Sequence, residues 1–187
     1  MEKLIVISAP SGAGKTSIIH DILKKREDIS FSVSACSREK RDQENNGKDY
    51  YFLGLKQFQQ KINEGAFLEW EEVYENQYYG TLRSEIKKIW SEGKTVLFDV
   101  DVVGGLNIKN QYPKECLAIF IMPPSITSLR ERLESRGSES EKNLEVRLAK
   151  AEKEISRNKE FDIVVLNDDF EIACKEVENA ISKFVKS

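Results

Sequence analysis

A short apolar run followed by a glycine-rich loop constrains this chain more than any other feature. Residues 4–7 read Leu-Ile-Val-Ile, and residues 8–17 read Ser-Ala-Pro-Ser-Gly-Ala-Gly-Lys-Thr-Ser. A continuous apolar run of this kind is typical of a strand buried on both faces of a parallel sheet. The residues behind it fit a phosphate-binding loop that leads into a helix. We therefore expect a strand, a loop and a helix that together bind a nucleotide phosphate.

The residue types in this loop suit the binding of a nucleotide phosphate and its metal ion. Gly12 and Gly14 allow a tight turn that presents backbone N–H groups to an anion. Lys15 can reach the β- and γ-phosphates, and the Thr16 hydroxyl suits a Mg²⁺ ion. The usual pattern has glycine where this chain has Ala9, which would be strained only at a positive φ, and we expect none there. The alternative interpretation is a glycine-rich turn in which the lysine is incidental.

Composition and charge limit the possible partners. The 187 residues, 40% of them apolar and 33% charged, fit one globular domain. The 29 basic and 32 acidic residues give a net charge of −3, so no overall positive field attracts nucleic acid. Three scattered cysteines and a single histidine favour reduced thiols, a cytoplasmic location and no histidine–cysteine metal cluster. We expect no signal peptide and no membrane contact, because the N-terminal apolar run is too short.

The remaining apolar patterns predict alternating strands and helices. Residues 78–81 are expected to be irregular, and residues 34–81 to form a small binding insertion between two core elements. Strands are expected at 31–37, 67–73, 95–101, 116–122 and 162–167, and helices at 55–64, 82–92, 125–136, 141–157 and near the C-terminus.

Charged residues near the expected strand ends are candidate ligands. Arg38 and Arg41 follow one strand, and with Tyr50 they could hold a phosphate through charge-assisted hydrogen bonds. Asp99 and Asp101 end another strand, where parallel sheets place their ligands and where an acid commonly helps to hold Mg²⁺. The alternative is that the first group lies in a solvated loop and the second only begins a loop.

Arginines also recur on the two helices expected after residue 124. Arg132 and Arg136 are four residues apart and therefore share a helix face, and Arg147 lies on the next helix. Such arginines are usually exposed surface. A helical pair opposite a phosphate loop can also be a lid that closes over a transferring phosphoryl group.

Taken together, these motifs follow the order found in one family. The matching segments are Ser-Ala-Pro-Ser-Gly-Ala-Gly-Lys-Thr (8–16), Phe-Ser-Val-Ser (31–34), Arg38 with Arg41, Gly-Lys-Asp-Tyr-Tyr-Phe (47–52), Phe-Leu-Glu-Trp (67–70), Tyr-Tyr-Gly-Thr (78–81), Asp-Val-Asp (99–101), Arg-Leu-Glu-Ser-Arg-Gly (132–137), Arg-Leu-Ala-Lys-Ala (147–151) and Val-Leu-Asn-Asp-Asp (165–169). Over essentially its whole length, the chain resembles the guanylate kinases, a family of nucleoside monophosphate kinases with a phosphate loop.

This resemblance implies a fold and a division of the chain. The fold is a three-layer α/β P-loop kinase fold with a central parallel sheet, and residues 1–187 form one domain. The core comprises 1–33, 82–124 and 158–187, the GMP-binding subdomain 34–81, and the helical lid 125–157.

The resemblance also implies a reaction, the Mg²⁺-dependent transfer of the γ-phosphoryl group of ATP to GMP, and to dGMP, in purine nucleotide metabolism and GMP recycling. Glu69 falls on the position of a carboxylate that accepts hydrogen bonds from guanine N1–H and the N2 amino group. The implied GMP-binding residues are Ser34, Arg38, Arg41, Tyr50, Glu69, Tyr79, Gly80, Thr81 and Asp101.

The same resemblance also implies which residues bind ATP, which bind the metal and which cations act in catalysis. The implied ATP-binding residues are Ser11, Gly12, Ala13, Gly14, Lys15, Thr16, Ser17, Arg136 and Asn167. Thr16 and Asp99 would serve the metal, and the catalytic cations would be Lys15, Arg41, Arg132, Arg136 and Arg147. No general base is needed, because the attacking phosphate oxygen of GMP is already ionised near pH 7.

The chain departs from the family pattern at several positions, none of which removes a charged ligand. Besides Ala9, these are Val103 in place of the usual Gln, Cys36 and Ser37 in place of a Thr pair, and Glu39-Lys40 before Arg41.

Two rival functions remain at this point. A kinase for another monophosphate is disfavoured because the Glu69 carboxylate would meet the wrong edge of the other bases. A phosphopeptide-binding module of this fold is disfavoured because Lys15, Thr16 and the lid arginines are all present.

Overall fold

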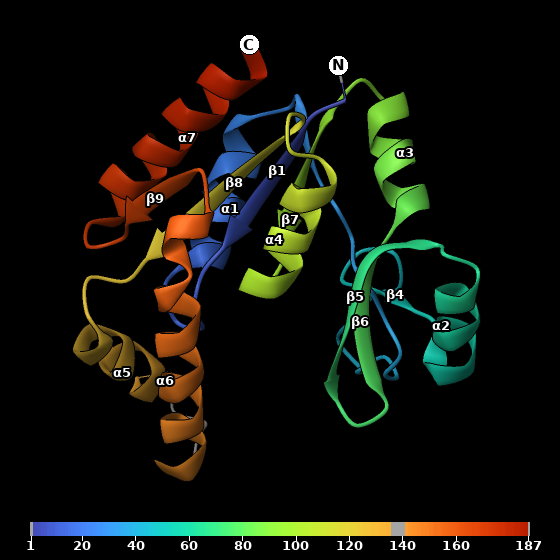
Figure 1. The fold of residues 1–187 in the computed structure, drawn as a ribbon, viewed down its shortest axis with the longest axis horizontal. Coiled ribbons are helices and arrows are strands. Elements are labelled where there is room, and N and C mark those ends of the chain that lie inside the picture. Colours follow the sequence, from blue (N-terminus) through green and yellow to red (C-terminus); the bar gives the residue numbers. More distant parts are fainter. Residues whose placement is uncertain (1, 136–140, 187) are drawn as a thin grey trace.

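Across residues 2–135 and 141–186, which the computed structural model describes, helices surround two β-sheets (Figure 1). The larger sheet has the strand order β2-β7-β1-β8-β9, and every pairing within it is parallel. Its strands are β1 (Leu4–Ser8), β2 (Ile29–Phe31), β7 (Thr95–Asp99), β8 (Cys116–Met122) and β9 (Ile163–Leu166). The predicted α/β fold with a central parallel sheet is therefore confirmed.

Helices cover both faces of this parallel sheet and extend beyond its edge (Figure 1). Helices α1 and α7 share a hydrophobic core with one face, and α3 and α4 share a core with the other. The helices are α1 (Lys15–Lys25), α2 (Gly54–Asn63), α3 (Arg83–Ser91), α4 (Val102–Gln111), α5 (Ile126–Glu134), α6 (Glu141–Ser156) and α7 (Phe170–Lys186), with a short 3-10 helix at Asn158–Glu160.

Strand β1 lies at the centre of the sheet and is buried on both faces. Leu4 and Val6 belong to the core beneath α3 and α4, whereas Ile5 and Ile7 belong to the core beneath α1 and α7. All four side chains are fully buried. Because side chains alternate along a strand, an unbroken apolar run is what a strand covered by two helical layers requires.

A second, smaller sheet lies to one side of the parallel sheet and has the order β4-β3-β6-β5 (Figure 1). Its strands are β3 (Ala35–Cys36), β4 (Tyr51–Phe52), β5 (Phe67–Tyr74) and β6 (Gln77–Leu82). Helix α2 packs Phe58 into its core, where the ring stacks on Phe67 with centroids 4.3 Å apart. This unit has a small core of its own, separate from the two large ones.

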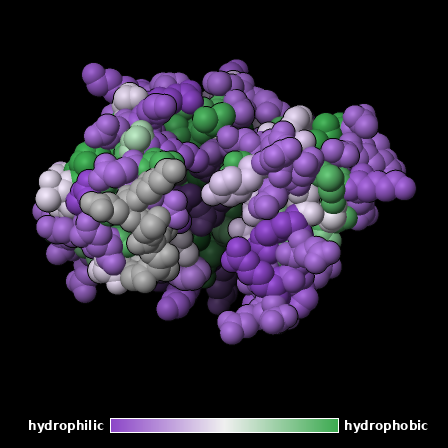
Figure 2. All heavy atoms as spheres, turned by 90° about the horizontal axis from the view of Figure 1, so that it is seen from below, coloured by the Kyte–Doolittle hydropathy of each residue, from purple (hydrophilic) through white to green (hydrophobic). Residues whose placement is uncertain are grey.

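The smaller sheet and the helical pair α5–α6 stand on opposite sides of the carboxyl ends of the central strands (Figure 1). Seen from below, the surface between them is hollowed, and its rim is largely hydrophilic (Figure 2). Two pockets open into this hollow.

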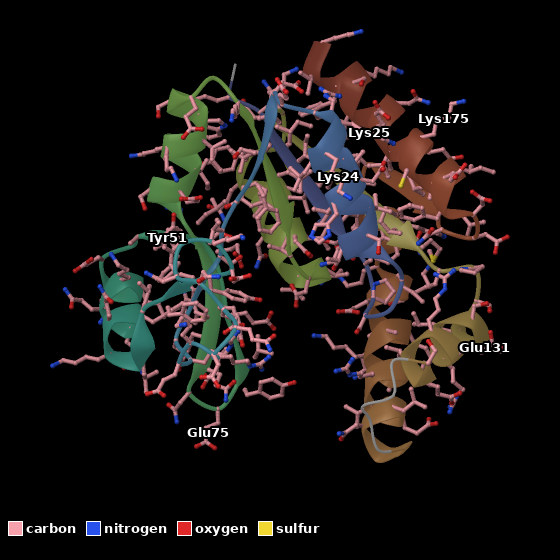
Figure 3. The ribbon with its side chains drawn as sticks, turned by 180° about the vertical axis from the view of Figure 1, so that it is seen from behind. Lys24, Lys25, Tyr51, Glu75, Glu131 and Lys175 are labelled. Carbon is pink, nitrogen blue, oxygen red and sulfur yellow. The ribbon has the colours of Figure 1, made fainter. Side chains whose placement is uncertain are left out.

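A hydrogen bond ties the smaller sheet to the helix that leads back to the core. Tyr51 lies next to α3 (Figure 3), and its hydroxyl donates to the Glu85 carboxylate on that helix at 2.8 Å; Glu85 is buried. Burial and this carboxylate raise the pKa of Tyr51 to about 12. The contact fixes the smaller sheet relative to α3.

Two predictions in this region were wrong. The strand expected at 31–37 is two strands, β2 and β3, which belong to different sheets. The chain changes sheets between them, since Ser32 N donates to Leu97 O at 2.9 Å while Ser34 O accepts from Tyr51 N at 2.9 Å. Residues 78–81, expected to be irregular, lie in β6 and pair with β5. A two-residue turn closes this hairpin, with Asn76 at φ 60°.

The strand expected at 95–101 ends two residues early, at Asp99. Asp101 is instead the N-cap of α4, a helix that the sequence patterns did not predict, and its carboxylate accepts from Gly104 N at 2.8 Å. Gly104 and Gly105 are poor helix formers, so the sequence of residues 102–111 did not indicate a helix. Gly105 is required by close packing, because a Cβ there would lie 2.5 Å from Ser8 Oγ.

Candidate active site

The phosphate loop runs between β1 and α1, as predicted. Gly12 and Gly14 have φ of 90° and 93°, a left-handed backbone region that glycine adopts without strain. Gly14 is the N-cap of α1, so the helix N-terminus points into the loop. Ala9 is not among the residues with positive φ, which confirms that alanine is unstrained there.

Asn167 stabilises this loop through a hydrogen bond to its backbone. It follows β9, is 5% exposed, and donates from its side-chain amide to Ala13 O at 2.6 Å. A Cβ at Gly14 would lie 2.3 Å from that amide nitrogen, so the two residues are in direct contact. Arg132 of α5 donates to the backbone oxygen of Asn167 at 3.0 Å. Neither Asn167 nor Arg132 lines either of the two pockets that open into the hollow.

One pocket, of about 330 Å³, opens at the phosphate loop, and we call it the loop pocket. The Lys15 ammonium contacts the Asp99 carboxylate and donates to Val100 O at 3.0 Å. Arg147 reaches in from α6 and donates to Ser11 Oγ at 3.4 Å. The lining residues are Ala9, Pro10, Ser11, Gly12, Lys15, Thr16, Asp99, Asp101, Arg147, Lys150 and Glu154.

The loop pocket contains oxygen ligands of the kind that Mg²⁺ takes. The Thr16 hydroxyl and the Asp99 carboxylate both line it, from the loop and from the end of β7. Within residues 2–135 and 141–186, no group of three or more His, Cys, Asp or Glu side chains could hold a metal by itself. Mg²⁺ commonly uses one or two protein ligands together with phosphates and water, so this donor set fits.

A second pocket, of about 230 Å³, lies between the β5–β6 hairpin and the end of β7, and we call it the hairpin pocket. Glu69, Glu71 and Val73 alternate along β5 and therefore face it together. Burial raises the pKa of Glu69, although the hydrogen bond from Thr81 opposes that shift. The lining residues are Ser34, Tyr50, Glu69, Glu71, Val73, Tyr79, Gly80, Asp99, Val100, Asp101 and Lys150.

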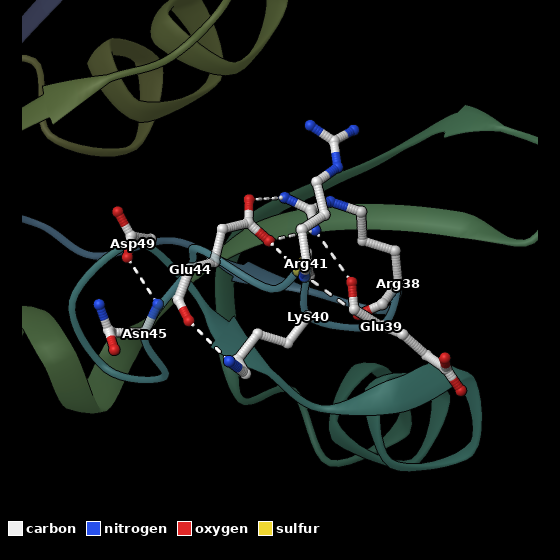
Figure 4. Close-up of polar contacts among 8 residues, drawn as sticks. Arg38, Glu39, Lys40, Arg41, Glu44, Asn45 and Asp49 are labelled. Carbon is white, nitrogen blue, oxygen red and sulfur yellow. Dashed lines mark hydrogen bonds and ion pairs between the residues drawn. The ribbon is translucent and has the colours of Figure 1, made fainter.

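Of the predicted phosphate ligands, Tyr50 and Tyr79 line the hairpin pocket, and Arg38 and Arg41 lie in the loop shown in Figure 4. Arg38 donates to both carboxylate oxygens of Glu44, at 2.7 and 2.5 Å, and Glu44 also accepts from Arg41 N at 2.9 Å. The Arg38 guanidinium lies over the Tyr50 ring, 5.1 Å from its centroid. The Tyr50 and Tyr79 rings meet edge to face at 5.8 Å. The Arg41 side chain extends away from Glu44 and lines neither pocket (Figure 4).

Sequence reasoning gave no site role to three side chains of this region, Glu44, Glu71 and Lys150. Glu44 fixes Arg38, and this ion pair, with the Arg41 backbone N–H, lowers the pKa of Glu44 to about 2. Glu71 contacts Asp101, and burial followed by that contact raises the pKa of Glu71 to about 7. Lys150 lies 4.0 Å from Asp101 Oδ2. Two of them had a sequence signal, since Glu71 is two strand residues after Glu69 and Lys150 is three helix residues after Arg147.

The structure therefore gathers most of the predicted residues around two adjoining pockets. Ser17 lies in the first turn of α1, and Ala13 is buried in the loop. Arg136 lies outside the described residues.

Among the described helices, none is both long enough and apolar enough to cross a membrane.

Comparisons with known proteins agree with this architecture. A family model described as guanylate kinase matches residues 1–184. The guanylate kinase of Porphyromonas gingivalis is 48% identical over 186 residues, covering 99% of each chain. That of Bacteroides thetaiotaomicron is 46% identical over 183 residues, covering 98% of this chain and 90% of the relative. A crystal structure of guanylate kinase from Anaplasma phagocytophilum superposes with a TM-score of 0.76 at 29% identity, covering 97% of this chain and 85% of that one. The chain belongs to the guanylate kinase family.

Proposed function

We propose that this chain transfers the γ-phosphoryl group of ATP to GMP, and also to dGMP, in a reaction that requires Mg²⁺. The observation that carries the proposal is the adjacency of the two pockets. The loop pocket is built on a phosphate loop, and the hairpin pocket contains the partly buried Glu69 carboxylate. Asp99 and Asp101 line both pockets, so a group bound in one lies next to a group bound in the other.

The hairpin pocket is the acceptor site in this proposal. Guanine presents N1–H and an N2 amino group as donors on one edge, and Glu69 is the matching acceptor. Adenine presents an acceptor at N1, which would face the carboxylate without a hydrogen bond. Ser34, Thr81 and Gly80 complete the base site, while the GMP phosphate is held by Arg38, Arg41, Tyr50 and Tyr79, and Asp101 lies near the nucleotide.

The loop pocket is the donor site. The backbone N–H groups of residues 11–17 and the N-terminus of α1 would hold the β- and γ-phosphates of ATP, with Lys15 between them. Thr16 and Asp99 would hold the metal. When bound there, Mg²⁺ would offset negative charge on the phosphate oxygens.

The chain contributes position and positive charge to the transfer itself. An oxygen of the GMP phosphate attacks the γ-phosphorus, and the bond from that phosphorus to the β,γ-bridging oxygen breaks. No side chain removes a proton, because a phosphate with a second pKa near 6 is already ionised at about pH 7. Lys15, Arg41, Arg132, Arg136 and Arg147 offset the charge that spreads in the transition state. We assign residues 125–157 as a lid and 34–81 as the GMP-binding subdomain, both closing on the substrates.

In the cell, we propose that the protein acts in the cytoplasm, in purine nucleotide metabolism and the recycling of GMP.

The test of the reaction is ADP formation from ATP with GMP or dGMP as acceptor, in Mg²⁺ and again after removal of divalent cations by EDTA. Turnover with both acceptors that stops in EDTA and returns with excess Mg²⁺ supports the proposal. Turnover that persists in EDTA would contradict the metal requirement, and turnover with GMP alone would contradict the dGMP assignment.

A further inference from the structure

Three residues line both pockets: Asp99, Asp101 and Lys150. We call this place the junction. Asp99 is the last residue of β7, Asp101 is the N-cap of α4, and Lys150 comes from α6, on the side of the hollow opposite the smaller sheet. If ATP and GMP occupy the two pockets as proposed above, the transferring phosphoryl group passes through the junction.

The junction contains two carboxylates, which would repel an anionic phosphoryl group. Lys15 already contacts Asp99 and belongs to the loop pocket only. Among the side chains that the structure describes, Lys150 is the one cation that lines both pockets. Its ammonium is therefore the group placed to offset that repulsion where the two nucleotides meet.

Lys150 is also held loosely enough to move onto a substrate. Its ammonium is 4.0 Å from Asp101 Oδ2 and 3.8 Å from Glu154 Oε1, both near the outer limit of an ion pair. The side chain is 60% exposed, and exposed pairs of this length are weak. A phosphate oxygen would compete with these carboxylates for a charge that sits on a flexible four-carbon stem.

The helix orients this lysine toward the junction. Leu144, Leu148 and Ala151 of α6 are buried in the core shared with α5 and fix the rotation of α6. Arg147 and Lys150 are three residues apart and so project from neighbouring positions on the helix. Arg147 reaches Ser11 in the loop pocket, whereas Lys150 lies near Asp101 at the junction. Helix α6 therefore contributes two cations, Arg147 and Lys150, and Lys150 lies at the junction.

We propose that Lys150 is a further catalytic residue, whose ammonium contacts the phosphoryl group as it passes between the two nucleotides. This inference rests on the proposed function. The ammonium lowers the barrier by offsetting charge while one phosphorus–oxygen bond forms and another breaks. A different role, that of a tether holding α6 to Asp101, would act on substrate affinity and stability instead.

The test compares Lys150→Met with Lys153→Met, in which the substituted lysine lies one turn further along α6 and lines neither pocket. Measurements are kcat and KM for each nucleotide, the Kd of GMP without ATP, and the thermal midpoint. We expect Lys150→Met to lower kcat by about tenfold or more, because a transition-state cation is lost, with little change in the Kd of GMP or the midpoint. Lys153→Met should behave like the unaltered protein, and Lys150→Arg should recover part of kcat.

Two results would overturn the inference. One is an unchanged kcat in Lys150→Met. The other is a loss confined to KM, GMP affinity or thermal stability, which would make Lys150 a tether. Failure of the proposed function is distinguishable, because the unaltered protein would then show no transfer to GMP.

Discussion

The Thr81 hydroxyl donates a hydrogen bond to Glu69 Oε1 at 2.7 Å, between residues that face each other across the β5–β6 pairing. The two side chains are adjacent because the register of the β5–β6 hairpin pairs Glu69 with Thr81. It orients the Glu69 carboxylate and leaves its other oxygen, Oε2, on the side of Gly104. A nucleotide base in the hairpin pocket would therefore meet an acceptor whose position is already set.

Removal of this bond should weaken GMP binding selectively. Thr81→Val keeps the shape of the side chain and removes the donor, so Glu69 loses its orientation. A hydrogen bond to a charged group contributes about 1.5–3 kcal/mol, so we expect KM for GMP to rise roughly tenfold or more. Steady-state kinetics should show KM for ATP unchanged, and an equal rise for both nucleotides would contradict the role given to this pair.

Lys15→Met tests the phosphate loop as the donor site. The substitution removes the ammonium between Asp99 and the expected γ-phosphate but leaves the hairpin pocket intact. Turnover should fall by about a hundredfold to a thousandfold, as for the loss of a preorganised charge-stabilising group. GMP binding, measured by calorimetry without ATP, should remain close to that of the unaltered protein. Near-normal turnover would refute the assignment of the donor site.

Asn167→Ala tests whether that residue acts through the loop. The substitution removes the buried amide that donates to Ala13 O, and leaving a buried carbonyl unpaired costs about 1–3 kcal/mol of unfolding free energy. Because the loop itself loosens, inorganic tripolyphosphate should lose affinity in the same proportion as ATP. Denaturant unfolding and competition binding measure the two effects. Normal stability and normal tripolyphosphate binding, with ATP alone weakened, would instead indicate a direct contact with adenine.

Glu71 should make stability depend on pH. Burial and the contact with Asp101 raise its pKa from 4.5 to about 7. Between these values the folded state holds a proton that the unfolded state has released, so unfolding free energy falls as pH rises through this window. Glu71→Gln keeps a donor toward Asp101 and removes the titration.

The stability of Glu71→Gln relative to the unaltered protein should therefore increase from pH 5 to pH 8 in denaturant unfolding. Glu75→Gln, at the exposed tip of the same hairpin, controls for the loss of a surface carboxylate (Figure 3). A relative stability of Glu71→Gln that is the same at both pH values would show that the carboxyl titrates normally.

Sequence patterns predicted the features whose cause is local. An apolar run indicates a doubly buried strand, and the order of glycines, lysine and threonine indicates a phosphate loop, so β1 and Lys15 were anticipated. The order of motifs then indicated Glu69 and Thr81, which the β5–β6 pairing brings together.

Features that depend on packing between distant segments were not predicted. Helix α4 contains two glycines, and Gly105 is there because the helix packs against Ser8 of β1. Residues 78–81 were expected to be irregular, whereas they form most of β6, which is a strand because it pairs with β5. The contact between Glu71 and Asp101 and the approach of Lys150 to the junction arise only when the two sides of the hollow face each other.

The acceptor specificity is measured by offering GMP, AMP, CMP, UMP and dTMP separately to the protein with ATP and Mg²⁺ and recording the initial rate of ADP formation. The geometry of Glu69 and Thr81 predicts turnover with GMP and only background rates with the other four. A rate with AMP or a pyrimidine nucleotide comparable to that with GMP, or no turnover with any of the five, would contradict the account.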